Sequence, residues 1–172
     1  MAGFVRGSGG HFAWEIMAKG AGLDSKKVRW VPYDSVGDAV TSVLGGHAQV
    51  AIAYVDLVKT HVAAGSMRVI GVMAEERVPQ FPQTPTLKEQ GFNVDNSWQQ
   101  MRGIIAPKGL PEPVRTKLSQ AIQQAMDSPD FKHYMTESSL VPAFQGPDAF
   151  LAFARQQDTV TKQWMNTLGL KR

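Results

Sequence analysis

In the first part of the chain, short apolar blocks change their spacing repeatedly, and most of them end at a glycine or a proline. Residues 12–19 place apolar side chains at helical spacing and predict a helix behind a glycine-rich stretch. Residues 27–33 alternate polar and apolar side chains and predict a strand that Pro32 ends. Residues 36–44 return to helical spacing, and the two glycines that follow predict the end of that helix.

Further strand and helix patterns follow in the same order. Residues 50–53 predict a short apolar strand, and Asp56 predicts the cap of a helix that Gly65 ends. Residues 67–74 predict a strand buried on both faces, and residues 101–106 predict another strand. This alternation predicts the α/β class, with a parallel sheet wrapped by helices.

Two pairs of residues have the spacing of a capping box, with a hydroxyl three positions before a carboxylate. Ser35 and Asp38 precede the helix predicted over 36–44. Thr86 and Glu89 follow a proline-rich passage and predict a short helix that ends at Gly91. Both pairs therefore predict helix starts.

A proline-rich break at residues 107–113 predicts a boundary between an α/β part, residues 1–106, and a mostly helical part, residues 107–172. In the second part we predict helices over 114–125, over 130–137 and from Pro147 onward, with a short extended piece at 140–144. Exposing their apolar faces is unfavourable by about 25 cal/mol per Å². We therefore expect these helices to pack on the first part, on another chain, or on a lobe that this chain lacks.

The composition is that of an ordinary globular protein, with 43% hydrophobic and 19% charged residues among 172. Cysteine is absent, which excludes disulfides and thiol chemistry. No run approaches the roughly 18 apolar residues of a membrane span, and residues 1–5 do not have the pattern of a signal peptide. The net charge of +3 mildly favours anionic partners, but the basic residues are scattered, which argues against nucleic acid.

The stretch Gly7-Ser8-Gly9-Gly10-His11 is the main candidate for function. Glycines allow several backbone N–H groups to point one way, and a helix that begins there adds unpaired N–H groups and the positive end of its dipole. Such a loop binds a carboxylate or a phosphate. The alternative is a tight turn with Ser8 as a helix cap. The stretch is neither a Walker loop, nor a dinucleotide fingerprint, nor a hydrolase elbow.

Other chemistry has weaker support in the sequence. The four histidines show no metal-ligand spacing, and we expect neither a metal nor a cofactor. A hydrolase that uses Ser8 and His11 lacks the elbow glycine and a recognisable triad. Trp98 and Arg102 are either a core indole and a solvated charge, or the wall of a cleft with a guanidinium that pairs with a carboxylate.

Several segments taken together, in their order, carry a family resemblance. They are Gly7–His11, Val31-Pro32-Tyr33 with the helix that ends at Leu44-Gly45-Gly46, residues 61–68, residues 81–91, and Arg102-Gly103 leading to Ala106-Pro107-Lys108-Gly109. This set resembles the substrate-binding proteins of tripartite tricarboxylate transporters, the Bug-type periplasmic receptors, and most closely their tricarboxylate-binding branch. The resemblance runs from about residue 5 to the C-terminus.

The resemblance implies a two-lobed receptor of the type II periplasmic-binding-protein fold, and not an enzyme. It implies that the protein captures a small organic carboxylate, such as a di- or tricarboxylate like citrate, in the periplasm and delivers it to membrane components of the transporter. Residues 1–106 would be lobe two, and residues 107–172 would be C-terminal helices of lobe one. Ser8, Gly9, Gly10 and His11 would hold the carboxylate, with Tyr33, Ser35 and Arg102 nearby.

Two departures from the family pattern affect this expectation. Family members are nearly twice as long, so the resemblance implies that the first half of lobe one is missing. The glycine loop is also shorter and lacks an acidic residue common before the histidine. The alternative is therefore a truncated receptor that self-associates or swaps its helices between chains and binds no ligand.

Overall fold

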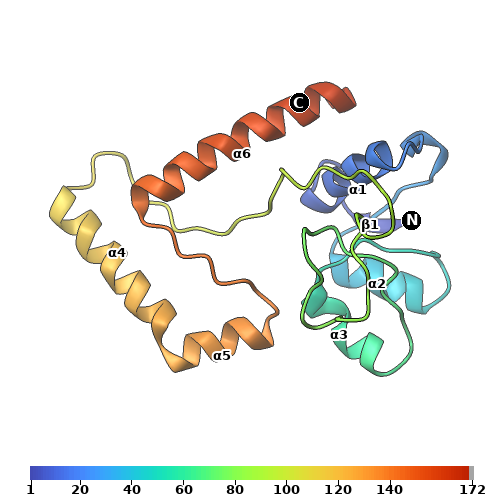
Figure 1. Ribbon diagram of the computed structural model, residues 1–172, viewed down its shortest axis with the longest axis horizontal. Helices are drawn as coiled ribbons and strands as arrows, with labels where there is room; N and C mark the ends of the chain where they lie inside the picture. The colour runs from blue at the N-terminus through green and yellow to red at the C-terminus, as the bar shows by residue number, and fades with distance from the viewer. Residues whose placement is uncertain (171–172) are drawn as a thin grey trace. The chain divides into compact units, whose positions relative to one another are not determined.

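The structure is a computed structural model that describes residues 1–170, and it divides into two compact units, Met1–Trp98 and Gln99–Arg172 (Figure 1). The division lies before the boundary that the sequence predicts at residue 106. The assignment of the two parts to the lobes of a receptor stays a prediction.

A small parallel sheet forms the centre of the first unit. The strands β1 (Ala2–Phe4) and β2 (Val31–Tyr33) pair in parallel, with Ala2 opposite Val31. On its other side, Ala2 forms an isolated parallel bridge with Ala51. The first segment in the chain therefore lies between the second and the third, which is the order at the switch point of a doubly wound fold.

Helices cover both faces of this sheet. They are α1 (Gly9–Gly20), the 3-10 helix η1 (Ser25–Lys27), α2 (Val36–Leu44) and α3 (Val55–Ala63). Ala2 packs with Ala39 of α2 and with Ala48 in one apolar cluster. Trp14 of α1 packs with Trp30 in a second cluster. The α/β class is confirmed, and the bounds of α2 are those that the sequence predicts.

Gly3 allows the two layers around Trp30 to approach closely. A Cβ atom on Gly3 would lie only 2.2 Å from Cζ2 of Trp30, so the indole occupies the space that a side chain would need. The indole Nε1 donates a hydrogen bond to the Phe4 carbonyl oxygen at 3.2 Å. Trp30 therefore ties the end of β1 to the start of β2.

The sheet is smaller than the sequence predicts. Of the strand predicted over 27–33, only Val31–Tyr33 forms, and Lys27 belongs to the 3-10 helix η1. The segment 50–53 forms a single bridge and not a strand. The predicted strand over 67–74 is wrong, since only Val72 forms a bridge there, with Thr86.

Two of the predicted strands, over 67–74 and over 101–106, do not form, and exposed apolar side chains in both segments give the reason. Ile70 is 58% exposed, so within residues 1–170 this run lacks the cover on both faces that a buried strand requires. The predicted strand over 101–106 is also wrong, because Ile104 and Ile105 are 72% and 91% exposed and the segment is irregular. Apolar runs of this length indicate burial, and the described chain does not supply the neighbours that would bury them.

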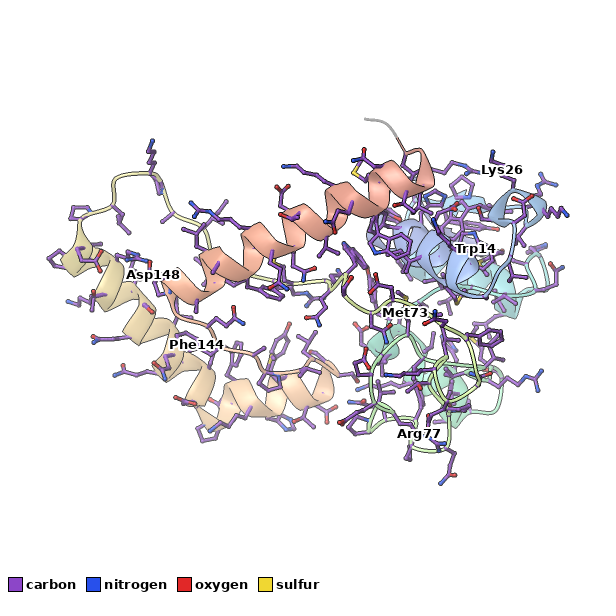
Figure 2. All side chains as sticks on the ribbon, turned by 45° about the horizontal axis from the view of Figure 1, so that its top comes forward. Trp14, Lys26, Met73, Arg77, Phe144 and Asp148 are labelled. Carbon is purple, nitrogen blue, oxygen red and sulfur yellow. The ribbon has the colours of Figure 1, made fainter. Side chains whose placement is uncertain are left out.

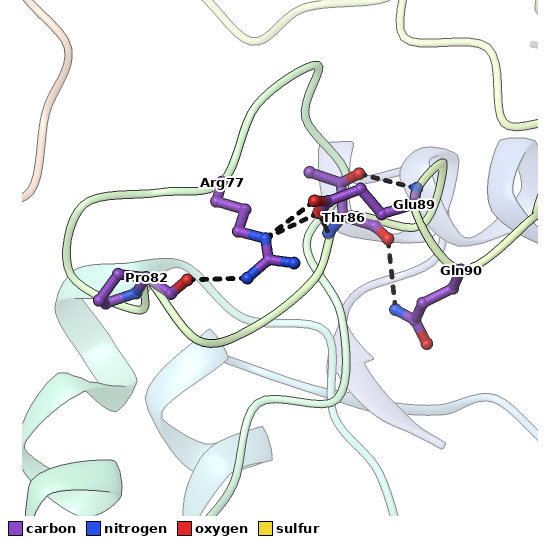
Figure 3. Close-up of polar contacts among 5 residues, drawn as sticks. All are labelled: Arg77, Pro82, Thr86, Glu89 and Gln90. Atoms are coloured by element: carbon purple, nitrogen blue, oxygen red, sulfur yellow. Dashed lines mark hydrogen bonds and ion pairs between the residues drawn. The ribbon is translucent and has the colours of Figure 1, made fainter.

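Of the two predicted capping boxes, that of Thr86 and Glu89 has both of its bonds, and that of Ser35 and Asp38 has the serine cap. Ser35 Oγ accepts from the N–H of Asp38 at 3.0 Å and caps α2. The Thr86 N–H donates to Oε2 of Glu89 at 2.7 Å, and the Glu89 N–H donates to Thr86 Oγ1 at 3.1 Å. Arg77 also holds the Glu89 carboxylate, with Nε 2.9 Å from it (Figure 3). This second box closes a single turn and not the predicted helix.

The third predicted cap is wrong. Asp56 lies in the first turn of α3, whereas Tyr54 occupies the capping position and makes no side-chain capping bond. An acidic side chain in the first turn still interacts favourably with the helix dipole. The sequence pattern therefore located the helix but not its first residue.

The second unit consists of helices joined by irregular segments. They are α4 (Glu112–Asp127), α5 (Pro129–Glu137) and α6 (Pro147–Leu168). Proline stands in the first turn of each, as Pro147 does at the predicted start of α6. Within this unit, the Gln157 side chain accepts from the N–H of Gln99 at 2.9 Å.

Much apolar surface stays exposed on the second unit. Val114 and Leu118 of α4 are 43% and 47% exposed, and Val141, after α5, is 84% exposed. The apolar face that the sequence predicts for α4 is therefore largely uncovered. Among the helices within residues 1–170, none combines the length and apolar character that crossing a membrane requires.

Candidate functional site

The glycine-rich stretch forms the connection between β1 and α1. Residues 5–8 leave the carboxyl end of β1, and Gly7 takes a positive φ of 82°, which glycine adopts without strain. Helix α1 begins at Gly9, with Ser8 as its capping residue. The strand before this loop was missed in the sequence, because an apolar run of three residues gives too short a pattern to detect.

The hydrogen bonds of this loop leave two backbone groups available. Ser8 Oγ accepts from the N–H of His11 at 3.3 Å, so the capping interpretation of Ser8 is correct. The Ser8 N–H donates to the Val5 carbonyl oxygen at 3.1 Å. Within residues 1–170, the N–H groups of Gly9 and Gly10 have no acceptor. They point out of the start of α1, where the helix dipole favours negative charge.

The side chain of His11 hydrogen-bonds to the backbone of the loop. Its Nδ1 accepts from the N–H of Gly7 at 3.2 Å, which places the ring proton on Nε2. The ring is buried, makes an edge contact with Trp30 at 4.9 Å, and has Nε2 3.5 Å from the Glu15 carboxylate. Burial lowers the pKa of His11, Glu15 raises it by a smaller amount, and Arg6 lowers it further. The neutral ring is therefore the favoured form.

Two further predicted residues lie at the same edge of the sheet. Because β1 and β2 run parallel with Phe4 opposite Tyr33, their carboxyl ends lead into loops on one side. The Tyr33 hydroxyl hydrogen-bonds to Ser42 Oγ, and Ser35 Oγ donates to Asp38 Oδ2 at 2.8 Å. Both hydroxyls therefore already have partners within the protein.

A third helix start, that of α3, adjoins this edge, and the sequence did not indicate that it belongs near the site. The bridge between Ala2 and Ala51 places the segment before α3 on the other side of β1. A Cβ atom on Gly10 would lie 3.7 Å from Ile52, so the two segments are neighbours. Tyr54, the capping residue of α3, is 40% exposed. Ligands in open α/β sheets bind at such a point, where the strand order reverses.

The remaining predicted residues have different surroundings. Trp98 packs edge to face on Phe12 of α1, with ring centroids 5.1 Å apart, so it is a packed indole within the first unit. Arg102 is exposed and belongs to the second unit. Its part in binding stays a prediction.

The described residues provide neither a metal site nor a catalytic triad. Within residues 1–170, no group of three or more histidine and acidic side chains could hold a metal ion. Ser8 Oγ is a hydrogen-bond acceptor for the helix, and the nitrogen of His11 nearest the loop already accepts from Gly7. The chemistry that the loop offers is donation by N–H groups to a negative oxygen.

Comparison with known proteins identifies the family. The model of the tripartite tricarboxylate transporter family receptor matches residues 1–170. A curated protein from Cupriavidus necator, described as a UPF0065 protein in the gbd 5' region, is 27% identical over 160 residues. That match covers 93% of this chain and 47% of the relative, so the chain spans about half the length of that relative.

Solved structures have the same fold. MatC from Rhodopseudomonas palustris, with bound malate, is 22% identical with a TM-score of 0.69, over 97% of this chain and 56% of that one. Another R. palustris protein, solved with adipate, is 20% identical with a TM-score of 0.73, over 98% and 56%. The periplasmic binding protein BugD is 21% identical with a TM-score of 0.68, over 99% and 56%.

These matches confirm the resemblance that the ordered motifs carry, from the glycine loop to Lys108-Gly109. The family model covers far more than half of the chain. Its members are solute-binding receptors of transporters and not enzymes, which agrees with a loop that offers hydrogen-bond donors and no nucleophile. The chain belongs to the tripartite tricarboxylate transporter receptor family.

Proposed function

We propose that this chain is the solute-binding part of a tripartite transporter receptor and that it binds a small organic carboxylate at the start of α1. The observation that carries the proposal is the pair of N–H groups on Gly9 and Gly10, which have no acceptor within residues 1–170. Two adjacent N–H groups at a helix N-terminus match the two oxygens of a carboxylate. The Ser8 hydroxyl adds a donor, because its oxygen accepts from His11 and its proton has no partner within the described chain.

The ligand is a di- or tricarboxylate in this proposal. The relatives solved with malate and with adipate hold dicarboxylates, which supports the class. Citrate is the tricarboxylate candidate. Tyr33 and Ser35 lie at the same edge of the sheet. Ser35 would donate to the ligand only after giving up its bond to Asp38, whereas the Tyr33 hydroxyl has its proton available when Ser42 is the donor in their shared bond. Arg102 remains the proposed counter-charge.

The proposal extends to the partners and the compartment. A receptor of this family delivers its ligand to membrane components, and we propose the same for the protein to which this chain belongs. We propose the periplasm as its location, by analogy with the periplasmic protein BugD. Because the chain spans about half the length of its relatives, its affinity for a carboxylate by itself is expected to be weak.

A proline substitution tests the site with little damage to the helix. Gly9 is the first residue of α1, where proline fits well, and Ser8 before it has ψ 166°, which suits a residue that precedes proline. Gly9→Pro removes one free N–H, and Gly9→Ala keeps it. We expect Gly9→Pro to weaken binding of malate or citrate about tenfold or more in calorimetric titration, since a hydrogen bond to a charged group contributes roughly 1.5–3 kcal/mol.

The matched pair of variants separates the outcomes. Gly9→Ala is expected to bind like the unmodified chain. Equal affinity of the Gly9→Pro and Gly9→Ala variants would remove the start of α1 from the site. Micromolar binding by the unmodified chain would show that this half of the receptor holds the ligand without the rest.

A second candidate function has an observation of its own. Ile104 and Ile105 are 72% and 91% exposed, and Val141 is 84% exposed, in the second unit. Such apolar exposure favours contact with another surface. If the chain self-associates through the second unit and binds no ligand, light scattering should show an oligomer. Calorimetric titration with malate, adipate or citrate should then give no heat of binding.

A further inference from the structure

A basic hollow on the first unit lies outside the glycine loop. It has a volume of about 420 Å³ and is formed by α1, the 3-10 helix η1 and the residues that lead into β2. Sites for small molecules have volumes of roughly 300–1,000 Å³. Trp14 and Lys26, two of its lining residues, lie on the same side of the first unit (Figure 2). The hollow is therefore large enough for a small ligand.

Basic side chains from three segments surround this hollow. They are Arg6 from the loop after β1, Lys26 and Lys27 from η1, and Arg29 before β2. Within residues 1–170, none of these four makes an ion pair with a carboxylate. Other basic side chains on the same chain do so, namely Arg77, Lys88, Arg115 and Lys162. The lining of the hollow therefore has four positive charges that no ion pair within residues 1–170 neutralises.

The one carboxylate in the lining does not cancel this charge. Glu15 accepts a hydrogen bond from Ser25 Oγ at 2.6 Å, and its other oxygen lies 3.5 Å from Nε2 of His11. Its side chain is only 17% exposed. The lining therefore holds four cations and one carboxylate that already has partners, so the charge of the lining is positive.

Two tryptophans also line the hollow. Trp14 and Trp30 belong to the buried cluster below the hollow, with 3% and 5% of their surface exposed. They are held in place by the core and give the hollow a rigid base. A cationic rim over this rigid base suits a small ligand that carries several negative charges.

We propose that this hollow is a second anion-binding site, for a small organic anion with two or more negative charges, separate from the N–H groups of Gly9 and Gly10. Guanidinium groups such as those of Arg6 and Arg29 pair with carboxylates in a bidentate manner, and the two lysines add point charges. Gathered like charges repel one another, and a bound anion removes that repulsion. The proposal does not depend on carboxylate binding at the start of α1.

The charge of Arg6 couples the hollow to the glycine loop electrostatically. Arg6 lies next to Gly7, whose N–H donates to His11. The charge of Arg6 lowers the pKa of His11, so an anion that neutralises Arg6 raises that pKa. An anion bound in the hollow should therefore change the pKa of His11 as well as the signals of the indole N–H groups of Trp14 and Trp30.

The test is a nuclear magnetic resonance titration of the full chain with benzene-1,3,5-tricarboxylate at low ionic strength. We expect saturable shifts at the indole N–H groups of Trp14 and Trp30 and a raised His11 pKa in the saturated protein. The double variant K26E/K27E should weaken this binding about tenfold or more, because it reverses two charges of the rim. The matched control K117E/K132E changes the net charge equally at exposed positions of the second unit and should leave the affinity unchanged.

Three results would overturn the second site. They are the absence of saturable shifts at Trp14 and Trp30, equal affinities in the two double variants, and shifts confined to the N–H groups of Gly9 and Gly10. The last result would leave the proposed function intact while removing the hollow. Shifts at Gly9 and Gly10 that persist in K26E/K27E while those at Trp14 and Trp30 disappear would support two separate sites.

Discussion

The backbone N–H of Gly7 donates to Nδ1 of His11, with 3.2 Å between the two nitrogens, so a side chain from the first turn of α1 closes the loop that leads into it. This bond requires a neutral ring, because a protonated ring has no acceptor. Burial of the ring favours the same neutral state. The shape of the loop is therefore coupled to the protonation of one histidine.

This coupling predicts a loss of stability in acid. The pKa of His11 in the folded protein lies below 6.5, its value in the unfolded chain, so the unfolded state binds more protons between the two values. The contribution of His11 is complete above pH 6.5 and falls as the pH drops toward the folded pKa. Its slope is at most about 1.4 kcal/mol per pH unit. Urea unfolding at a series of pH values between 8 and about 5 measures this slope.

Two variants isolate the effect of His11 from that of other titrating groups. His11→Gln removes the ring and should flatten the dependence of unfolding free energy on pH below 6.5. His133→Gln, at an exposed position of α5, should retain the dependence of the unmodified chain. Equal slopes in both variants would show that His11 does not control the loss.

Ser8 is expected to contribute to stability separately from any ligand. Its Oγ caps α1 through the N–H of His11, and alanine in place of a serine cap costs typically about 1 kcal/mol, whereas glycine costs only a few tenths. Ser8→Ala should therefore lower the free energy of unfolding more than Ser8→Gly does. Both variants lose the hydroxyl donor and should weaken carboxylate binding alike. If both variants unfold at the same urea concentration, the cap does not stabilise the helix.

Gly3 is expected to tolerate no side chain. In the Gly3→Ala variant, the Cβ atom would meet Cζ2 of Trp30 at 2.2 Å, and overpacking of this kind costs typically about 1–3 kcal/mol. Gly37→Ala in α2 is the control, because its Cβ atom would find Ser35 Oγ at an ordinary 3.5 Å and alanine favours helix. Thermal unfolding should show a lower Tm for Gly3→Ala and an unchanged or higher Tm for Gly37→Ala.

The exposed apolar residues of the second unit predict a change in association. The double variant I104S/I105S removes two side chains that are 72% and 91% exposed, so it should reduce self-association and leave the folded state intact. Light scattering after size exclusion over a range of concentrations measures the mass, and circular dichroism checks the helix content. An oligomer of unchanged mass in the variant would exclude this segment as the contact surface.

The predictions made from the sequence succeeded where the pattern is local. Ser35 with Asp38, and Pro147 at the start of α6, are signals within one turn of the chain, and both were confirmed. The capping box of Thr86 and Glu89 also formed, although it closes only one turn. Strands depend on distant partners. In the described chain, the run at 67–74 finds one only at Val72, and the run at 101–106 forms no strand.

At the candidate site too, the sequence predicted the local features and did not predict the contacts between distant residues. The sequence indicated the loop around Ser8 and its helix, because glycine conformations and capping hydroxyls act over a few residues. It gave no sign that Nδ1 of His11 would take the N–H of Gly7, or that Tyr33 would bond to Ser42. The basic hollow was also hidden, since Arg6 and Arg29 meet only when β1 and β2 pair.

The sequence by itself determined the family, the α/β class and the presence of a helix behind the glycine loop, because ordered short motifs and helix patterns are properties of neighbouring residues. Only the tertiary structure decided which donors of the loop remain available, namely the N–H groups of Gly9 and Gly10 within residues 1–170. The reason is that a hydrogen-bond partner is chosen by distance in space, and β1, β2 and the segment before α3 are brought to one edge by parallel pairing.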